Sequence, residues 1–128
     1  MNRGDRMEEK VYCYLIKNHI GKDNLIKNKD LRKLFDIKSD KSMRKVIQNI
    51  RENSKFYLIV GSISGKTGGF FICQTEEEMD DTINNIKHRA NEMYRMCHIL
   101  NSIKEKILNG WQKENYLNII IYHLKSKI

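Results

Sequence analysis

The chain has 128 residues, 40% of them hydrophobic and 31% charged, with 24 Lys and Arg against 16 Asp and Glu and a net charge of +8. This length suits one domain with an appendage and a modest core that needs neither disulfides nor metal. Nothing resembles a signal peptide, and the apolar run near the end, IIIY (119–122), is far too short to span a membrane, so we expect a soluble cytoplasmic protein.

The positive charge is concentrated in the first half of the chain. Residues 1–56 hold 15 Lys and Arg against 8 Asp and Glu, whereas residues 75–109 hold 5 against 7. A basic region confined to one part of a protein is typical of proteins that bind a phosphate backbone, although a basic helix surface can also be merely solvated.

The cysteines and histidines are scattered and form no recognisable site. The cysteines are Cys13, Cys73 and Cys97, and the histidines are His19, His88, His98 and His123. Without a C-x-x-C pair or a nucleophile with a base at suitable spacing, they predict no disulfide framework, metal site, cofactor site or catalytic residue. We interpret the cysteines as reduced core thiols and expect a protein that is not an enzyme.

In chain order, the first predicted helix covers about residues 5–19 and ends at Gly21. Its apolar face contains Met7, Val11, Tyr14 and Leu15. The segment NLIK (24–27) is predicted to be a short extended link that can add one bridge to a sheet.

Two short helices are predicted next, joined by about three residues. Asp30 is the expected cap of the first, which contains Leu31, Leu34 and Phe35, and Ile37 anchors the turn. Ser39 is the expected cap of the second, where Met43, Val46, Ile47 and Ile50 recur at i, i+3, i+4 and i+7. This pattern predicts a helix-turn-helix.

The face of that second helix opposite its apolar stripe carries polar and basic side chains. Lys41, Arg44, Lys45, Gln48, Asn49 and Glu52 lie there, and Ser42 stands in the first turn. The first residues of a recognition helix lie deepest in the major groove, where Arg and Lys can donate to guanine and Gln and Asn can pair with adenine. We therefore predict DNA contacts at every one of these residues except Glu52; the alternative is an ordinary amphipathic helix with a solvated face.

The segment YLIVGSISGKTGGFFIC (57–73) contains a GKT triplet after a run of strand-forming residues. A nucleotide-binding loop needs four residues between its glycines and a helix after the triplet. Here Gly61 and Gly65 enclose three residues, and aromatic and β-branched residues follow Gly69. We therefore predict a hairpin from about residue 56 to residue 73, with Lys66 and Thr67 at its tip, positioned to contact DNA as the wing of a winged helix.

The stretch LRKLFDIKSDKSMRKVIQNIREN (31–53), followed by GSISGKTGGFFICQTEEEMDDTINNIKHRA (61–90), resembles a family of small phage-encoded winged-helix proteins over roughly residues 28–108. The resemblance implies a DNA-binding accessory of replication or transcription regulation, located in the host cytoplasm. The chain differs from the family pattern in having Phe70 and Phe71 as its aromatic pair, a longer wing and Ile50 in place of a leucine.

A single long helix is predicted over residues 75–109. Thr75 and Glu78 form a capping box, and no Gly or Pro follows before Gly110. Seven residues are spaced by 4, 3, 4, 3, 4 and 3 and define a heptad seam: Met79, Ile83, Ile86, Ala90, Met93, Cys97 and Leu100. The seam predicts a coiled-coil-like homodimer, and packing within one chain is the alternative.

The last segment, residues 110–128, is apolar and fits either a helix or a strand. We favour a short helix with Trp111 packed at its start, covered at the dimer interface. The predicted fold is thus mostly α with a small antiparallel β-hairpin: a winged helix-turn-helix (1–74), a long dimerising helix (75–109) and an apolar segment (110–128). The expected partner is double-stranded DNA, with a host protein as the alternative.

Overall fold

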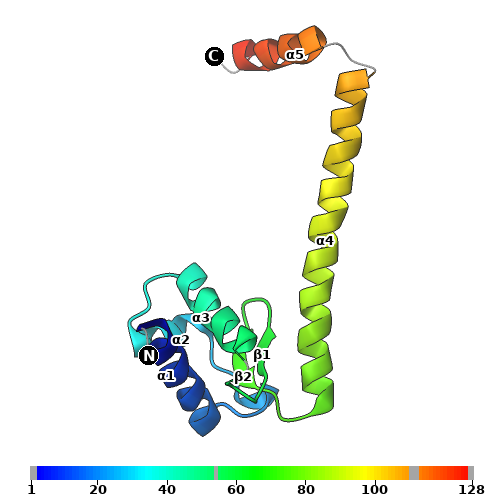
Figure 1. Ribbon diagram of the computed structural model, residues 1–128. Helices are drawn as coiled ribbons and strands as arrows, with labels where there is room; N and C mark the ends of the chain where they lie inside the picture. The colour runs from blue at the N-terminus through cyan, green and yellow to red at the C-terminus, as the bar shows by residue number, and fades with distance from the viewer. Residues whose placement is uncertain (1–2, 54, 110–112, 127–128) are drawn as a thin grey trace. The chain divides into compact units, whose positions relative to one another are not determined.

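The computed structural model (Figure 1) describes the backbone of residues 3–53, 55–109 and 113–126. The chain forms two compact units, Met1–Asn85 and Ile86–Ile128, which we call the N-terminal unit and the C-terminal unit. The elements are α1 (Arg3–Asn18), the 3-10 helix η1 (Lys22–Asn24), α2 (Asn28–Phe35), α3 (Asp40–Glu52), β1 (Val60–Ile63), β2 (Gly69–Ile72), α4 (Glu76–Asn109) and α5 (Lys113–Ser126). The prediction of a mostly helical protein with a small antiparallel hairpin is confirmed. The predicted domain boundaries after residues 74 and 109 stay predictions.

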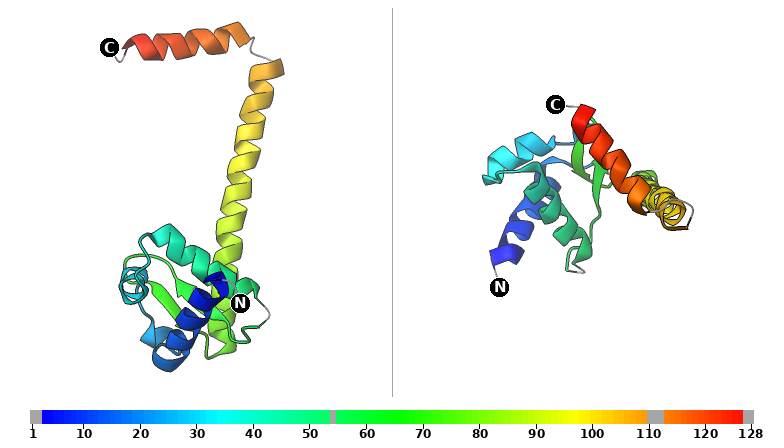
Figure 2. Two further views of the ribbon diagram at one scale, coloured as in Figure 1. Left: turned by 60° about the vertical axis from the view of Figure 1, so that its left-hand side comes forward. Right: turned by 90° about the horizontal axis from the view of Figure 1, so that it is seen from above.

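The core of the N-terminal unit lies between α1, α2, α3 and the two strands, as Figure 2 shows from two further sides. Five of the residues that periodicity placed inside are fully buried: Val11 and Leu15 of α1 and Met43, Ile47 and Ile50 of α3. Leu34 of α2 is instead exposed. Burying such side chains contributes about 1.5–3 kcal/mol each, so these three helices hold their relative positions mainly by apolar packing.

The start of α2 differs from the prediction, whereas the turn that follows this helix agrees with it. Helix α2 begins at Asn28, and Lys27 stands at its N-cap without a side-chain hydrogen bond, so the prediction that Asp30 caps this helix is wrong. Asp30 lies in the first turn, where its carboxylate still suits the helix dipole. The chain turns at Asp36, the one described residue other than glycine with positive φ (53°). Ile37 then packs against the core, as predicted.

The sheet consists of β1 and β2, paired antiparallel with Val60 opposite Ile72 and Ile63 opposite Gly69. The segment between α1 and α2, residues 19–27, which we call the link, borders the other edge of β2. Ile26 forms an antiparallel bridge with Phe70, which confirms the one bridge predicted for residues 24–27. A second, parallel bridge joins Ile20 to Ile72 and was not predicted. A strand rather than a helix follows the GKT triplet, so the hairpin interpretation is confirmed and the nucleotide-loop interpretation is wrong.

Helix α4 has 34 residues, about 50 Å at 1.5 Å per residue. Of the two hydrogen bonds of the predicted capping box, the one to the threonine is present at the start of this helix: the Thr75 hydroxyl accepts from the Glu78 amide at 3.1 Å. The Glu78 carboxylate, however, turns to the amides of Gln74 and Lys22, at 2.7 and 3.1 Å. This carboxylate ties the beginning of α4 to the link after α1.

The C-terminal segment is helical, so the helix interpretation is confirmed and the strand interpretation is wrong. Trp111, predicted to pack at the start of this helix, lies outside the described residues. Within residues 3–53, 55–109 and 113–126, no helix is both long enough and apolar enough to cross a membrane.

Candidate nucleic-acid interface

The first turn of α3 is held by the cap that the sequence predicted. The Ser42 amide donates a hydrogen bond to the Ser39 hydroxyl oxygen at 3.0 Å, and that hydroxyl donates to the Ser42 hydroxyl at 2.8 Å. A serine cap of this kind stabilises a helix by roughly 1 kcal/mol. The cap defines where the predicted contact residues Lys41, Ser42, Arg44 and Lys45 begin, and all four are exposed.

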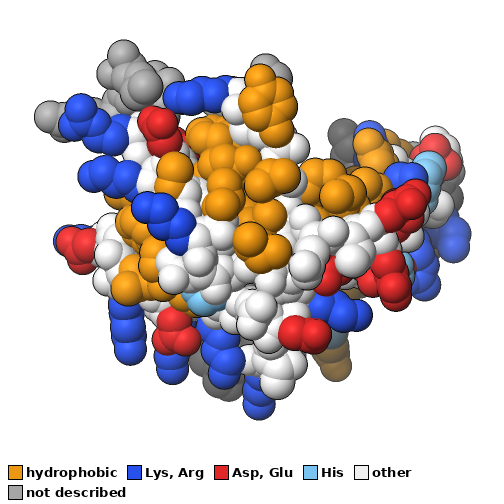
Figure 3. Space-filling view, turned by 90° about the horizontal axis from the view of Figure 1, so that it is seen from below, with side chains coloured by type: hydrophobic (Ala, Val, Ile, Leu, Met, Phe, Trp, Pro, Cys, Tyr) orange, Lys and Arg blue, Asp and Glu red, His pale blue; other side chains and the backbone are white. Residues whose placement is uncertain are grey.

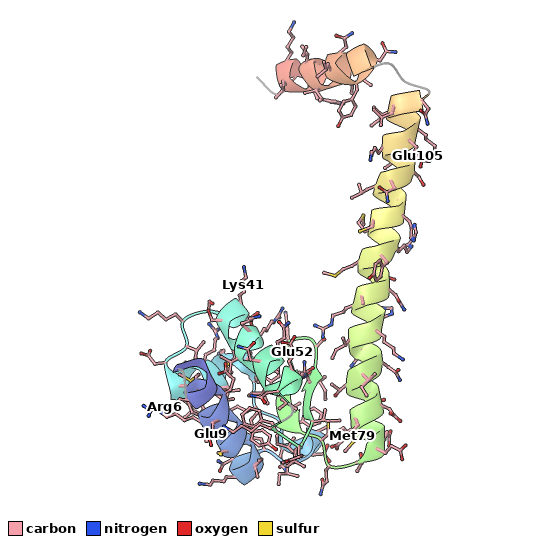
Figure 4. All side chains as sticks on the ribbon, in the orientation of Figure 1. Arg6, Glu9, Lys41, Glu52, Met79 and Glu105 are labelled. Atoms are coloured by element: carbon pink, nitrogen blue, oxygen red, sulfur yellow. The ribbon has the colours of Figure 1, made fainter. Side chains whose placement is uncertain are left out.

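Lys41 and Lys45 have no hydrogen bond or ion pair among the described residues, whereas Arg44 pairs with Asp40 at 2.9 Å. Figure 4 shows Lys41 at the start of α3 and Glu52 in its last turn. The pair of Arg44 and Asp40 is largely exposed, with side-chain exposures of 68% and 51%. Exposed pairs of this kind contribute at most about 1 kcal/mol, so the guanidinium can exchange the carboxylate for a phosphate at little cost.

The two amides of α3 have different surroundings. Gln48 is exposed, and its amide donates to the Glu52 carboxylate at 2.8 Å, one turn further along the same helix. Asn49 is half-buried, and its amide donates to the buried carboxylate of Glu8 in α1 at 3.2 Å. The assignment of Asn49 as a DNA contact stays a prediction, and its hydrogen bond in this structure connects α3 to α1.

The hairpin turn carries the other predicted contacts, because Lys66 and Thr67 lie exposed between β1 and β2. The hairpin is attached to α3 by Arg51, whose guanidinium donates to the Val60 carbonyl at 2.9 Å and to the Ser62 hydroxyl at 3.1 Å. Figure 1 shows the hairpin alongside α3. Sequence reasoning missed this role of Arg51; a basic residue in the last turn of the helix gave no indication of a partner nine to eleven residues away.

A polar cleft of about 330 Å³ lies between the sheet and the beginning of α4, and the sequence did not predict it. Lys22, Ser62, Ile63, Phe71, Glu78, Asp81, Thr82, Asn84 and Asn85 line it. Glu78 is the most constrained group there: the hydrogen bond from the Gln74 amide lowers the pKa of this carboxyl, outweighing the opposite effect of burial, and the Lys22 amide lowers it further. Both oxygens of this carboxylate thus accept a hydrogen bond from a backbone amide.

The three cysteines differ in their exposure to solvent. Cys73 is buried, with its sulfur 3.9 Å from the Thr82 hydroxyl, and burial raises the pKa of its thiol. Cys13 and Cys97 are exposed, so the prediction that the cysteines are core thiols is wrong for both. Among the residues that the structure describes, no group of three His, Cys, Asp or Glu side chains could hold a metal ion.

The predicted dimer seam runs along both units. Met79 and Ile83 belong to the N-terminal unit, and Ile86, Ala90, Met93, Cys97 and Leu100 to the C-terminal unit. Met79 and Ala90 are half-buried, while the other five are exposed, and Met93 is 72% exposed. An apolar row left in solvent is typical of an interface, although the partner that covers it stays a prediction.

A second apolar surface lies on the N-terminal unit. The ring of Tyr12 in α1 contacts that of Phe56 in a tilted arrangement, with centroids 4.6 Å apart, and the Tyr12 hydroxyl accepts a hydrogen bond from the Leu58 amide at 3.1 Å. Tyr57 beside them is 90% exposed. We call these four residues, Tyr12, Phe56, Tyr57 and Leu58, the aromatic strip. Figure 3 shows one face of the molecule on which hydrophobic side chains gather.

Comparison of the chain with known protein families, with curated proteins and with solved structures found no match.

Proposed function

We propose that the N-terminal unit is a winged helix-turn-helix that binds double-stranded DNA, with α3 as the recognition helix and the hairpin as the wing. The observation that carries this proposal is the exposed row of Lys41, Arg44, Lys45 and Gln48 on a helix whose other face is anchored in the core. A rigid helix with cations in its first two turns suits the major groove. The order of helix, two-helix pair and hairpin supports it further.

In this proposal each side chain has a distinct role. Lys41 and Lys66 contact phosphates and set the position of the protein on the duplex without reading sequence. Arg44 leaves Asp40, and together with Lys45 it donates to phosphate or to guanine, while Gln48 can pair with adenine. The hydrogen bonds from Arg51 to β1 keep the wing at a constant distance from α3, so both elements meet the duplex together.

We further propose that the protein acts as a homodimer, joined through α4, in replication or transcription control of a phage or mobile element, inside the host cytoplasm. One domain of this size with a handful of cationic contacts binds weakly at physiological salt. Two linked units on one duplex raise the apparent affinity without any new contact, because the second binds at the high effective concentration set by the first.

Replacing Arg44 and Lys45 together by alanine should weaken binding to duplex DNA about 10-fold or more. Each lost phosphate contact should also reduce the slope of log K against log salt by about 0.9. Fluorescence anisotropy with a random duplex at several salt concentrations measures both quantities. The matched control is Lys87→Ala with Lys106→Ala in α4, which removes two positive charges at positions outside α3. If the control and the test variant lose equal affinity for DNA, α3 is not the DNA-binding helix.

A second candidate function is binding to a host protein, and the aromatic strip favours it. Tyr57 is 90% exposed and stands beside Leu58 and the paired rings of Tyr12 and Phe56, an arrangement that is typical of a protein contact. Tyr57→Ser with Leu58→Ser should then abolish capture of a defined host partner while leaving duplex binding intact. If the wild-type chain fails to bind duplex DNA even at low salt, this second function takes precedence over the first.

A further inference from the structure

The second half of α4 is apolar over a much wider surface than a heptad seam requires. Between residues 93 and 109, seven large apolar side chains are exposed: Met93, Tyr94, Met96, Ile99, Leu100, Ile103 and Leu108. At 100° per residue, the apolar positions cover an arc of about 220° from Ile99 to Tyr94. Only two polar residues, Asn101 and Lys104, fall within that arc.

The first half of α4 lacks this width. Between residues 76 and 92 the large apolar side chains are confined to the seam itself, at Met79, Ile83 and Ile86. A two-stranded coiled coil buries a narrow stripe of this kind and leaves the rest of each helix in water. A helix with an apolar arc of about 220° instead needs neighbours on two sides, as in the interior of a bundle.

Helix α5 has the same character as the second half of α4. Seven of its large apolar side chains are exposed: Tyr116, Leu117, Ile119, Ile120, Ile121, Tyr122 and Leu124. Without Tyr122 they still cover an arc of about 200°. The 14 residues of α5 extend about 21 Å and residues 93–109 about 25 Å, so the two apolar surfaces match in length.

The separation of the two helices in the sequence suits antiparallel neighbours. Three residues lie between Asn109, the last residue of α4, and Lys113, the first of α5. Antiparallel helices in bundles are commonly joined by connections of two to eight residues, of which roughly three is typical of a tight pair. One such pair, however, covers only one side of each helix and leaves the remainder of both arcs in water.

We propose that residues 93–126 form a helical hairpin that pairs with the same hairpin of a second copy in a four-helix bundle. This inference rests on the dimerisation proposed above and places the dimer interface in the second half of α4 and in α5. Of the predicted seam, Met93, Cys97 and Leu100 stay in the interface, whereas Met79, Ile83, Ile86 and Ala90 lie outside it. A second copy supplies two helices of the same length and apolar width, related by a two-fold axis.

The size of the apolar surface on residues 93–126 and the charges within it are compatible with a second copy of the chain as the partner. Fourteen large apolar side chains are exposed on the two segments. Large contiguous apolar surfaces are rare on monomeric proteins and mark interaction sites. Such a set can supply the roughly 800 Å² per partner of a stable interface. Lys104, the one charged residue within the arc of α4, can lay its methylenes along the bundle and extend its ammonium group into solvent.

The test compares substitutions at positions that are buried in the four-helix bundle with one at a position that is buried only in a two-stranded coiled coil. In the full chain, Ile120→Ser in α5 and Leu100→Ser in α4 should each weaken dimerisation about 100-fold or more, because every substitution enters the interface twice. Ile86→Ser, at a seam position outside the bundle, should leave the dimer unchanged. Light scattering and sedimentation over a range of protein concentrations measure the association.

A second measurement does not depend on variants. A single helix of 14 residues is marginal in water, so the amides of α5 should exchange rapidly with solvent unless the helix is packed. In the wild-type dimer we expect residues 116–124 to be protected together with residues 93–108. Rapid exchange of α5 within a stable dimer would overturn the bundle.

The possible results distinguish a failure of the bundle from a failure of dimerisation or of DNA binding. If Ile86→Ser dissociates the dimer and Ile120→Ser does not, the bundle is wrong while dimerisation through α4 stands. A wild-type chain that stays monomeric at high concentration removes dimerisation and the bundle together, and DNA binding by the N-terminal unit is then measured independently. Binding of the monomer to lipid vesicles, with α5 protected only there, would assign the apolar surface to a membrane and overturn the bundle.

Discussion

Replacing Gly69 by alanine is expected to destabilise the N-terminal unit by about 3 kcal/mol. A Cβ at this position would stand 2.1 Å from the carbonyl oxygen of Ile26. Ile26 cannot simply move away, because its amide donates to the Phe70 carbonyl at 2.9 Å and its carbonyl accepts from the Phe70 amide at 2.8 Å. The substitution must therefore separate the link from β2 and expose Ile26, which is buried in the core.

Gly65→Ala provides the matched comparison, since the same methyl group would meet no atom within 4 Å there. Its cost comes only from the positive φ of +100°, which is worth roughly 1–2 kcal/mol. Urea unfolding at fixed protein concentration measures both variants, and exchange of the Ile26 and Phe70 amides reports the local opening. If the two alanine variants are equally stable, the close approach of the link to β2 does not hold.

The elements that the sequence predicted correctly are those whose signals are local. The 3.6-residue period of Met43, Ile47 and Ile50, the serine at residue 39 and the aromatic residues after Gly69 each specify structure within a few positions. The error at Asp30 is also local: Lys27 takes the extended backbone that precedes a helix, so α2 starts before the aspartate. Asp30 is a favourable cap residue, but it lies in the first turn of α2 instead of before it.

The contacts that the sequence did not reveal join residues far apart in the chain. The Lys22 amide meets Glu78 at a separation of 56 residues, and Asn49 meets Glu8 at a separation of 41. Neither partner belongs to a periodic pattern, so spacing contains no information about them. The candidate site shows the same limit, because helical periodicity placed Asn49 on the polar face of α3 but could not indicate that α1 would engage its amide.

The beginning of α4 is connected to the rest of the N-terminal unit through the side chain of Glu78. Glu78 is 8% exposed and accepts hydrogen bonds from two backbone amides, one on each side of the junction. A carboxylate can serve both donors, because each of its oxygens is an acceptor. It thereby orients the first turns of α4 against the link that borders β2.

Replacing Glu78 by glutamine is therefore expected to cost about 2 kcal/mol of unfolding free energy at neutral pH, since hydrogen bonds to charged groups are worth about 1.5–3 kcal/mol. The glutamine side chain offers one oxygen, so one of the two amides would face an NH2 group instead of an acceptor. Glu77→Gln is the matched control: it removes the same charge from the same turn, but Glu77 is exposed.

The loss should also depend on pH in a defined direction. The hydrogen bond from the Gln74 amide lowers the pKa of Glu78 below its ordinary value of 4.5, so the folded chain binds fewer protons than the unfolded chain in that range. Its contribution is fully present above about pH 5 and is lost as the pH falls through the folded-state pKa. Unfolding curves of the wild type and of Glu78→Gln should therefore differ by a constant amount above about pH 5 and converge in acid. A difference that grows on acidification, or one that Glu77→Gln reproduces, would show that the carboxylate does not hold this junction.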